Sequence, residues 1–304
     1  MQLKIQILAL AITAITATNI KAQVKDSTDL MSMLEKETSG DNRDSTIYTR
    51  ATFKTTRLIN GHTVENLGKG VLDVKISHRF GTLNKGGYEL FGLDNATMRL
   101  GFDYGITNNF MVGIGRSTFQ KTYDAFFKIK LLRQSTGKVN MPITLSYVPT
   151  IALKTLRRSD PSQKNPFSSK LFYSHQLIIG RKFSAGTSLQ LMPTYIHRNL
   201  AELTTDPNDI LAIGIGGRQK LSKRVSINVE YYYQLPGHKQ DTSTNSLSIG
   251  FDIETGGHVF QLHFTNSMGM SERTFIGETT GKWGKGDTLF GFNISRVFNV
   301  GKKR

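Results

Sequence analysis

Hydrophobic and polar residues alternate along most of the chain after residue 70, and the stretch Asn95–Ser117 shows the pattern most clearly. Between residues 96 and 104 every second residue is apolar, and the residues between them are polar or glycine. A period of two predicts a strand with one apolar and one polar face. Ile106–Asn109 is a turn sequence, after which the alternation resumes around small residues. The stretch therefore predicts a hairpin of two strands of about ten residues each, a length that suits tilted strands crossing a bilayer.

Similar alternating segments recur as far as the C-terminus. The segments expected as strands are 71–80, 95–105, 110–117, 123–131, 141–147, 171–179, 189–195, 211–215, 225–233, 247–253, 260–264 and 290–298. Their number, about twelve and even, predicts an all-β fold, an antiparallel transmembrane β-barrel. Pro149 and Pro193 interrupt two of the segments, and we expect a β-bulge or a strand end at each because proline lacks the N–H of the ladder.

The connections between these segments alternate in length. Short turns are expected near Thr107, Gly137, Ala185, Ser222 and Gly256, and longer loops at 81–94, 154–170, 198–208, 235–245 and 267–287. Only Thr118–Lys121 breaks this rule. Short periplasmic turns and longer extracellular loops are typical of outer-membrane barrels, whereas a soluble sandwich has no reason to segregate its loops.

The chain before the barrel divides into two parts. Residues 1–22 read as a secretory signal peptide, with a basic start, an apolar centre and a small residue before the expected cleavage. Residues 23–70 form a periplasmic lead-in or a plug segment. Within them Ile47–Leu58 has strand character but polar groups on both faces, so it lines or plugs the pore or lies in the periplasm. The barrel is expected over residues 71–299, followed by a basic tail at 300–304.

Several motifs carry a resemblance to a known family. The run FKTTRLINGHTVE, ISHRFG, YELFGLDNATMRLGFDYGITNN and KTYDAFFKIKLLRQ lies between Ala51 and Arg133, and GGHVFQLHFTNSMGM and LFGFNISRVF lie near the C-terminus. Together these motifs resemble an uncharacterised β-barrel family of the Bacteroidota outer membrane, a domain of unknown function. The resemblance implies a barrel fold and a membrane, and it implies no substrate and no catalytic residues.

Composition and charge narrow the classes of function. Cysteine is absent, which excludes disulfides, thiol catalysis and cysteine-based zinc sites. The net charge of +16 comes from basic residues scattered over strands and loops, so contact with anionic lipid phosphates is favoured over nucleic acid. We expect no nucleic-acid partner.

Candidate catalytic motifs fail on spacing. The seven histidines form no HExxH pair, and His258 and His263 would point to opposite faces of one strand. No His-x-Ser pair supports a barrel lipase, and Asp287 stands where the lysine of the phosphate-binding loop would be needed. We expect no enzyme activity, no cofactor and no metal.

Charged residues of both signs fall on the polar strand faces, where lipid contact would cost several kcal/mol each. The lumen-lining candidates are Asp73, Lys75, Arg79, Arg99, Asp103, Asp124, Lys128, Lys130, Glu230 and Asp252. Two interpretations stay open: a salt-bridged interior that fills the barrel, and a narrow channel with screened charge.

One long loop is basic, and its residues are candidates for binding lipopolysaccharide phosphates: Lys154, Arg157, Arg158, Lys164 and Lys170. The sequence thus predicts an outer-membrane barrel that acts as a narrow channel for small polar solutes or as a structural barrel. The alternative is an accessory or binding barrel that engages a periplasmic or surface partner without catalysis. Outer-membrane lipid is the expected environment.

Overall fold

Twelve antiparallel strands close into a barrel in the computed structural model, which describes residues 45–157, 166–201, 203–255 and 258–301. The expected signal peptide, the lead-in up to residue 44 and most of the basic tail lie outside the described residues. The barrel strands are β2 (Val71–Thr82), β3 (Ala96–Gly105), β4 (Phe110–Ser117), β5 (Thr122–Leu132), β7 (Thr144–Lys154), β8 (Leu171–Lys182), β9 (Thr187–Arg198), β10 (Asp209–Lys220), β11 (Val225–Gln234), β12 (Ser246–Thr255), β13 (His258–Thr265) and β14 (Leu289–Asn299). The expected all-β barrel of about twelve strands is confirmed.

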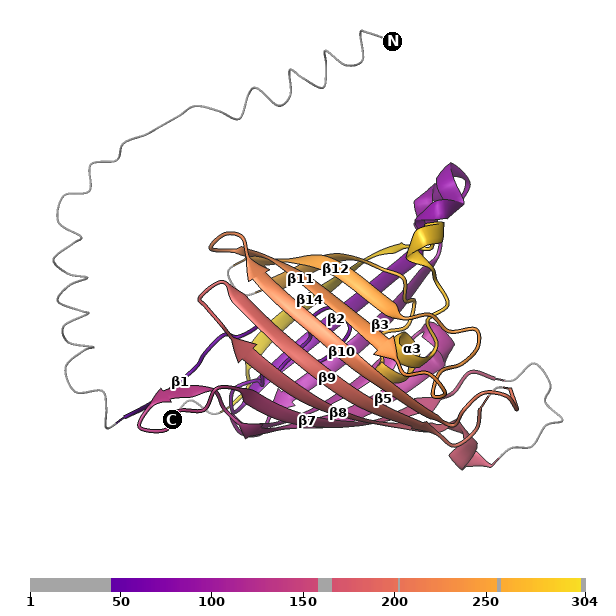
Figure 1. The fold of residues 1–304 in the computed structure, drawn as a ribbon. Helices are drawn as coiled ribbons and strands as arrows, with labels where there is room; N and C mark the ends of the chain where they lie inside the picture. The colour runs from indigo at the N-terminus through magenta and orange to yellow at the C-terminus, as the bar shows by residue number, and fades with distance from the viewer. Residues whose placement is uncertain (1–44, 158–165, 202, 256–257, 302–304) are drawn as a thin grey trace, which may run out of the picture. The chain divides into compact units, whose positions relative to one another are not determined.

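The first and last strands of the barrel close it. Each strand pairs with its sequence neighbours, and β14 pairs with β2, for example through Phe298 opposite Leu72. Figure 1 shows the tilted strands wrapping around one axis. Because every barrel strand has two neighbours, the barrel has no free edge.

Alternation along the strands decides which side chains enter the lumen. In the β3–β4 hairpin, Arg99 and Asp103 are buried inside the barrel, with exposed fractions of 3% and 1%. Ile114 on β4 points outward and is 61% exposed. The same inward and outward alternation runs through the other strands, so the outer surface is apolar. The interior holds the charged and polar residues together with a buried apolar cluster that includes Met111, Ile178 and Met192.

Two prolines differ from what the sequence predicts. Pro149 and Pro193 lie inside β7 and β9, opposite His175 and Ile213, and neither marks a strand end or a bulge. On the other side of each proline two pairings are missing, yet the register is unchanged across the gap. The prediction was wrong because a missing N–H interrupts hydrogen bonding to one neighbour only, and the second neighbour keeps the strand in place.

The connections gather at two ends of the barrel, which we name the turn end and the loop end. The turn end carries the short turns at 106–109, 183–186 and 221–224, and the loop end carries the connections between β2 and β3, β7 and β8, β9 and β10, β11 and β12, and β13 and β14. The 133–143 connection at the turn end is longer, because it contains β6 (Ser135–Gly137), which pairs with β1 (Thr46–Tyr48). Because β1 ends at Tyr48, the prediction of a strand over Ile47–Leu58 is wrong for the residues after Tyr48.

The helices found in the described residues are short and lie in connections. The 3₁₀ turns are η3 (Leu83–Gly92), η4 (Phe119–Lys121), η5 (Phe167–Lys170) and η6 (Trp283–Lys285), and the α-helix of the 266–288 loop is α3 (Glu272–Gly277). Within the described ranges, no helix has the length and hydrophobicity needed to cross a membrane.

Candidate functional site in the barrel lumen

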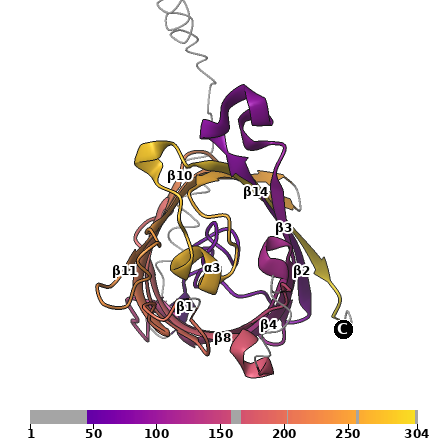
Figure 2. The ribbon, with the colours of Figure 1, turned by 90° about the vertical axis from the view of Figure 1, so that its right-hand side faces the viewer.

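Residues 52–67, which we name the plug, run through the inside of the barrel rather than along its wall. Thirteen of these sixteen residues are buried, and Lys54, Glu65 and Asn66 are half-buried. Figure 2 looks along the barrel and shows this segment inside the ring of strands, next to α3. Because the plug forms no strand, the wall must satisfy many of its backbone groups.

One wall carboxylate receives three backbone donors of the plug. Glu230 of β11 accepts hydrogen bonds from the N–H groups of Ile59 at 3.3 Å, Asn60 at 2.8 Å and Gly61 at 3.1 Å. A Cβ at Gly61 would lie 2.0 Å from the hydroxyl oxygen of Tyr232, so this approach requires glycine. Asn60-Gly61 thus forms the tip of the plug turn, held against β11.

Wall side chains also donate to the carbonyl oxygens of the plug. Lys128 Nζ donates to Thr63 O at 3.0 Å and to Glu65 O at 2.8 Å. The amide groups of wall residues donate in the same way, Gln190 to His62 O at 2.8 Å, Gln261 to Leu58 O at 2.7 Å and Asn293 to Ile59 O at 2.9 Å. Donors from four different strands therefore fix the path of the plug.

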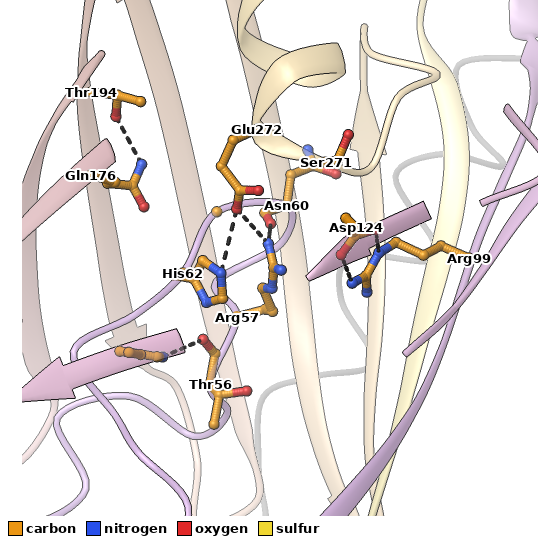
Figure 3. A network of polar contacts seen from close by, with 12 residues as sticks. Thr56, Arg57, Asn60, His62, Arg99, Asp124, Gln176, Thr194, Ser271 and Glu272 are labelled. Atoms are coloured by element: carbon orange, nitrogen blue, oxygen red, sulfur yellow. Dashed lines mark hydrogen bonds and ion pairs between the residues drawn. The ribbon is translucent and has the colours of Figure 1, made fainter. Parts of the chain in front are cut away.

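The loop-end helix α3 meets the plug inside the barrel. Ser271 and Thr274 form a capping box at its start, and all six residues of the helix are buried. Glu272 accepts from Nη1 of Arg57 at 2.7 Å, and Nε2 of His62 lies 3.5 Å from the same oxygen (Figure 3). This carboxylate joins the plug, which starts at the turn end, to the loop that enters from the loop end.

His62 is fully buried in this cluster. Its ring packs edge-on against Phe126 at 4.4 Å, and neither ring nitrogen has a hydrogen-bond partner within the described chain. Burial, followed by the charge of Arg57, lowers the pKa of His62 well below its ordinary value. The imidazole is therefore neutral at neutral pH, and the Glu272 charge is balanced by Arg57.

Ion pairs inside the wall bring several of the lumen candidates together. Lys75 lies 2.8 Å from Asp73 and 2.6 Å from Asp103, and Arg99 pairs with Asp124 through Nε and Nη2. The Lys75–Asp103 pair joins the adjacent strands β2 and β3, and the Arg99–Asp124 pair reaches across β4 from β3 to β5. Each charge is buried but compensated, as buried ions require.

The remaining lumen candidates take no part in these ion pairs. Asp252 of β12 accepts a hydrogen bond from Gln261 at 2.9 Å. Lys130 is only partly buried, near the turn end. Arg79 donates to Oδ1 of Asn60 at 2.8 Å and to Oδ1 of Asn293 at 3.0 Å. All ten candidates, including Lys128 and Glu230, lie on inward positions of their strands.

The basic loop candidates do not form a cluster in the described chain. Lys154 ends β7, Arg157 is exposed, and Lys170 ends η5. Arg158 and Lys164 lie outside the described residues.

Sequence reasoning left the plug open as one option and missed α3. The plug has no period, and its only signal was a segment with polar groups on both faces that precedes the regular strands. Glu272, Arg273 and Thr274 carry no apolar stripe, so nothing marked this part of a long loop as buried. Among the described residues, no three His, Asp or Glu side chains gather where they could hold a metal ion.

Comparisons with known proteins place the chain in a family. The chain has no significant match among curated proteins. Among solved structures, the NanC porin aligns with a TM-score of 0.47 at 8% identity, covering 74% of this chain and 98% of the porin. The KdgM porin aligns at 0.44 and 10% identity, covering 75% and 99%. Omp33 of Acinetobacter baumannii aligns at 0.42 and 8% identity, covering 75% and 97%.

The sequence itself gives the stronger result. Residues 53–298 match the family described as "Membrane bound beta barrel domain (DUF5777)", so the match begins within the plug and ends in the last barrel strand. The chain belongs to this family of membrane-bound β-barrel domains.

Proposed function

We propose that this protein is a non-catalytic outer-membrane barrel of a bacterium of the Bacteroidota, and that its lumen is a gated passage for small polar solutes. The observation that supports the proposal is the plug, which lies in the lumen and is held by polar contacts to the wall as well as by an apolar cluster that includes Leu58 and Val64. The plug is the gate, and the structure corresponds to its closed state.

The chemistry of the interface suits a segment that leaves the lumen. Glu230, Lys128 and Gln261 all offer polar groups that water can satisfy once the plug has moved. The lumen also contains an apolar cluster, in which Leu58 and Val64 of the plug lie with wall residues such as Met192, so the polar contacts make up only part of the interface. A wall of paired charges remains wettable, which a passage for polar solutes requires.

The location rests on sequence and on the outer surface together. The apolar outward positions and charged inward positions of the wall suit lipid outside and water inside. Residues 1–22 would direct export, with the turn end in the periplasm and the basic loop from Lys154 to Lys170 facing lipopolysaccharide phosphates.

A disulfide between plug and wall tests the gate. An ideal Cβ at Gly180 of β8 lies 3.4 Å from Cβ of Val64, close to the separation in natural disulfides. The chain has no cysteine of its own, so within one molecule the two cysteines introduced by Val64→Cys and Gly180→Cys can form a disulfide only with each other. In planar bilayers the oxidised double variant should be silent, and reduction of the same sample should produce discrete conductance steps.

The wild-type protein should also show discrete steps, unaffected by the reductant. Silence of both the wild type and the reduced variant at all voltages would overturn the passage and leave a structural barrel. Equal conductance of the oxidised and reduced variants would show that the plug is not the gate.

An accessory role is the second candidate, favoured by the position of β1. This strand pairs with β6 at the turn end and directly precedes the plug. A periplasmic partner that binds this short sheet would act on the plug without any solute flow. Co-purification of the wild-type barrel with a periplasmic protein, lost when residues 46–48 are replaced by glycine and serine, would support this role.

A further inference from the structure

Arg79 is a buried cation that forms no hydrogen bond with a carboxylate among the described residues. Its exposed fraction is 1%, and its guanidinium donates only to neutral oxygens: the carbonyl of His78 at 2.9 Å and the side-chain amides of Asn293 and Asn60. Its Nε has no hydrogen-bond partner in the described chain. A buried charge without a counter-charge in contact with it is strongly unfavourable, so this position calls for an anion.

The wall carboxylates nearby are already engaged. Asp73 and Asp103 face Lys75, and Asp124 faces Arg99. Glu230 accepts three backbone N–H groups of the plug, among them that of Asn60, whose side-chain oxygen in turn accepts from Arg79. None of these acids forms a hydrogen bond with Arg79.

A cavity of about 20 Å³ lies beside Arg79, between the plug and the wall. Four of its lining residues are cations, Arg57, Lys75, Arg79 and Arg99, and no lining residue is acidic. The other polar lining groups are amides and hydroxyls, which can donate hydrogen bonds. A volume of this size holds one small ion or water molecule.

We propose that this cavity binds a single small monovalent anion, with chloride as the physiological ligand. Arg57, Lys75 and Arg99 each contact an acid directly, whereas Arg79 contacts none among the described residues, so a monovalent anion in the cavity would supply the partner that its guanidinium lacks. The ion contacts both the wall and the plug, since Arg57 and Asn60 line the same cavity. Chloride therefore acts as a bridge that holds the plug in its seat.

The test uses the purified barrel in detergent with bromide and chloride as probes. Crystals grown in sodium bromide should show an anomalous bromine peak against Arg79. In solution, replacing gluconate by chloride at constant ionic strength should raise the midpoint of thermal unfolding by about 2–4 °C, because the ion binds the folded state only. Both measurements are independent of conductance, so they do not depend on the gated passage.

Two variants and one control assign the effect to this site. Arg79→Gln removes the cation that has no acid partner, and Ser77→Asp places a tethered carboxylate in the cavity lining; each should abolish the chloride dependence. Arg218→Gln alters another buried arginine, outside the cavity lining, and should keep it. A water molecule in place of bromide with no chloride dependence, or a chloride dependence that survives in both cavity variants, would overturn the proposal.

Discussion

Arg57 and Glu272 are 215 residues apart in the chain, yet Nη1 of Arg57 donates to Oε1 of Glu272 at 2.7 Å inside the barrel. Arg57 belongs to the plug, and Glu272 begins the helix of the longest loop-end connection. Both side chains are almost completely buried. The two segments that fill the lumen from opposite ends are therefore joined by one buried ion pair.

Removing one partner of this pair should be costly. Glu272→Gln leaves Arg57 as an uncompensated buried charge, and we expect the free energy of unfolding to fall by about 3–5 kcal/mol. The double variant Arg57→Met with Glu272→Met removes both charges and should recover most of this loss. Urea unfolding of the barrel in lipid vesicles measures both effects.

An exposed pair serves as the control. Lys54 and Glu254 form an ion pair in which the side chains are 24% and 43% exposed. Lys54→Met should change the free energy of unfolding by at most about 1 kcal/mol. Equal losses for Glu272→Gln and Lys54→Met would contradict the role assigned to the buried pair.

Glu230 should control how tightly the plug is seated. Glu230→Gln replaces one carboxylate oxygen by an NH₂ group that faces the donor N–H groups of Ile59, Asn60 and Gly61. We expect the plug to be released more often, with a several-fold increase in open probability in planar bilayers. The reason is that unpaired buried donors cost about 1–3 kcal/mol.

Gln234→Met on the same strand is the matched control for Glu230→Gln. Gln234 faces inward but bonds to Ser243 and Thr244 of a loop-end connection instead of the plug. The open probability of the Gln234→Met variant should equal that of the wild type. An unchanged open probability in Glu230→Gln would remove Glu230 from the gate.

The strands could be predicted because lipid and lumen impose a period of two. Arg99 and Ile114 illustrate this: the charged side chain points inward and the apolar one outward, as the alternation of their strands predicts. The resemblance to a membrane barrel family pointed to the same fold. No equivalent rule acts on a segment that is surrounded by protein on all sides.

The site could be predicted only in part for that reason. The plug and α3 satisfy their polar groups through contacts such as Asn60 with Glu230, which join positions 170 residues apart and leave no local pattern. The ten lumen candidates followed from strand alternation, whereas Arg57, His62 and Glu272 did not. These three residues lie in segments without strand periodicity.

The plug should become less stable in its seat at low pH. His62 lies in the plug, outside the barrel strands, and burial lowers its pKa well below the ordinary value of about 6.5. The released state therefore binds a proton more readily than the seated state. The stabilisation that neutral His62 gives to the seated plug is complete above pH 6.5. It is lost as the pH falls from there towards the lowered pKa of His62.

Conductance as a function of pH measures this effect. We expect the open probability of the wild type to rise as the pH is lowered from 7 to 5. The His62→Phe variant should not show this rise, because its ring cannot take up a proton. His175→Phe on the outer face of β8 is the control and should keep the rise. A rise that persists in His62→Phe would assign the pH response to another group.

The outward face of β4 gives a direct test of how the barrel lies in the membrane. Ile114 is the fifth of eight residues in this strand, and its side chain is 61% exposed on the outer surface. Ile114→Lys would place an ammonium group in the hydrocarbon region, and we expect the free energy of unfolding in lipid vesicles to fall by about 2–4 kcal/mol. Ile106→Lys makes the same change in the adjoining turn, where water or headgroups can solvate the charge, and should cost at most about 1 kcal/mol. The difference between the two variants depends on depth in the bilayer, so it should disappear when the unfolding is measured in a water-soluble amphipol. Equal costs in lipid would mean that this face of the hairpin does not contact the membrane interior.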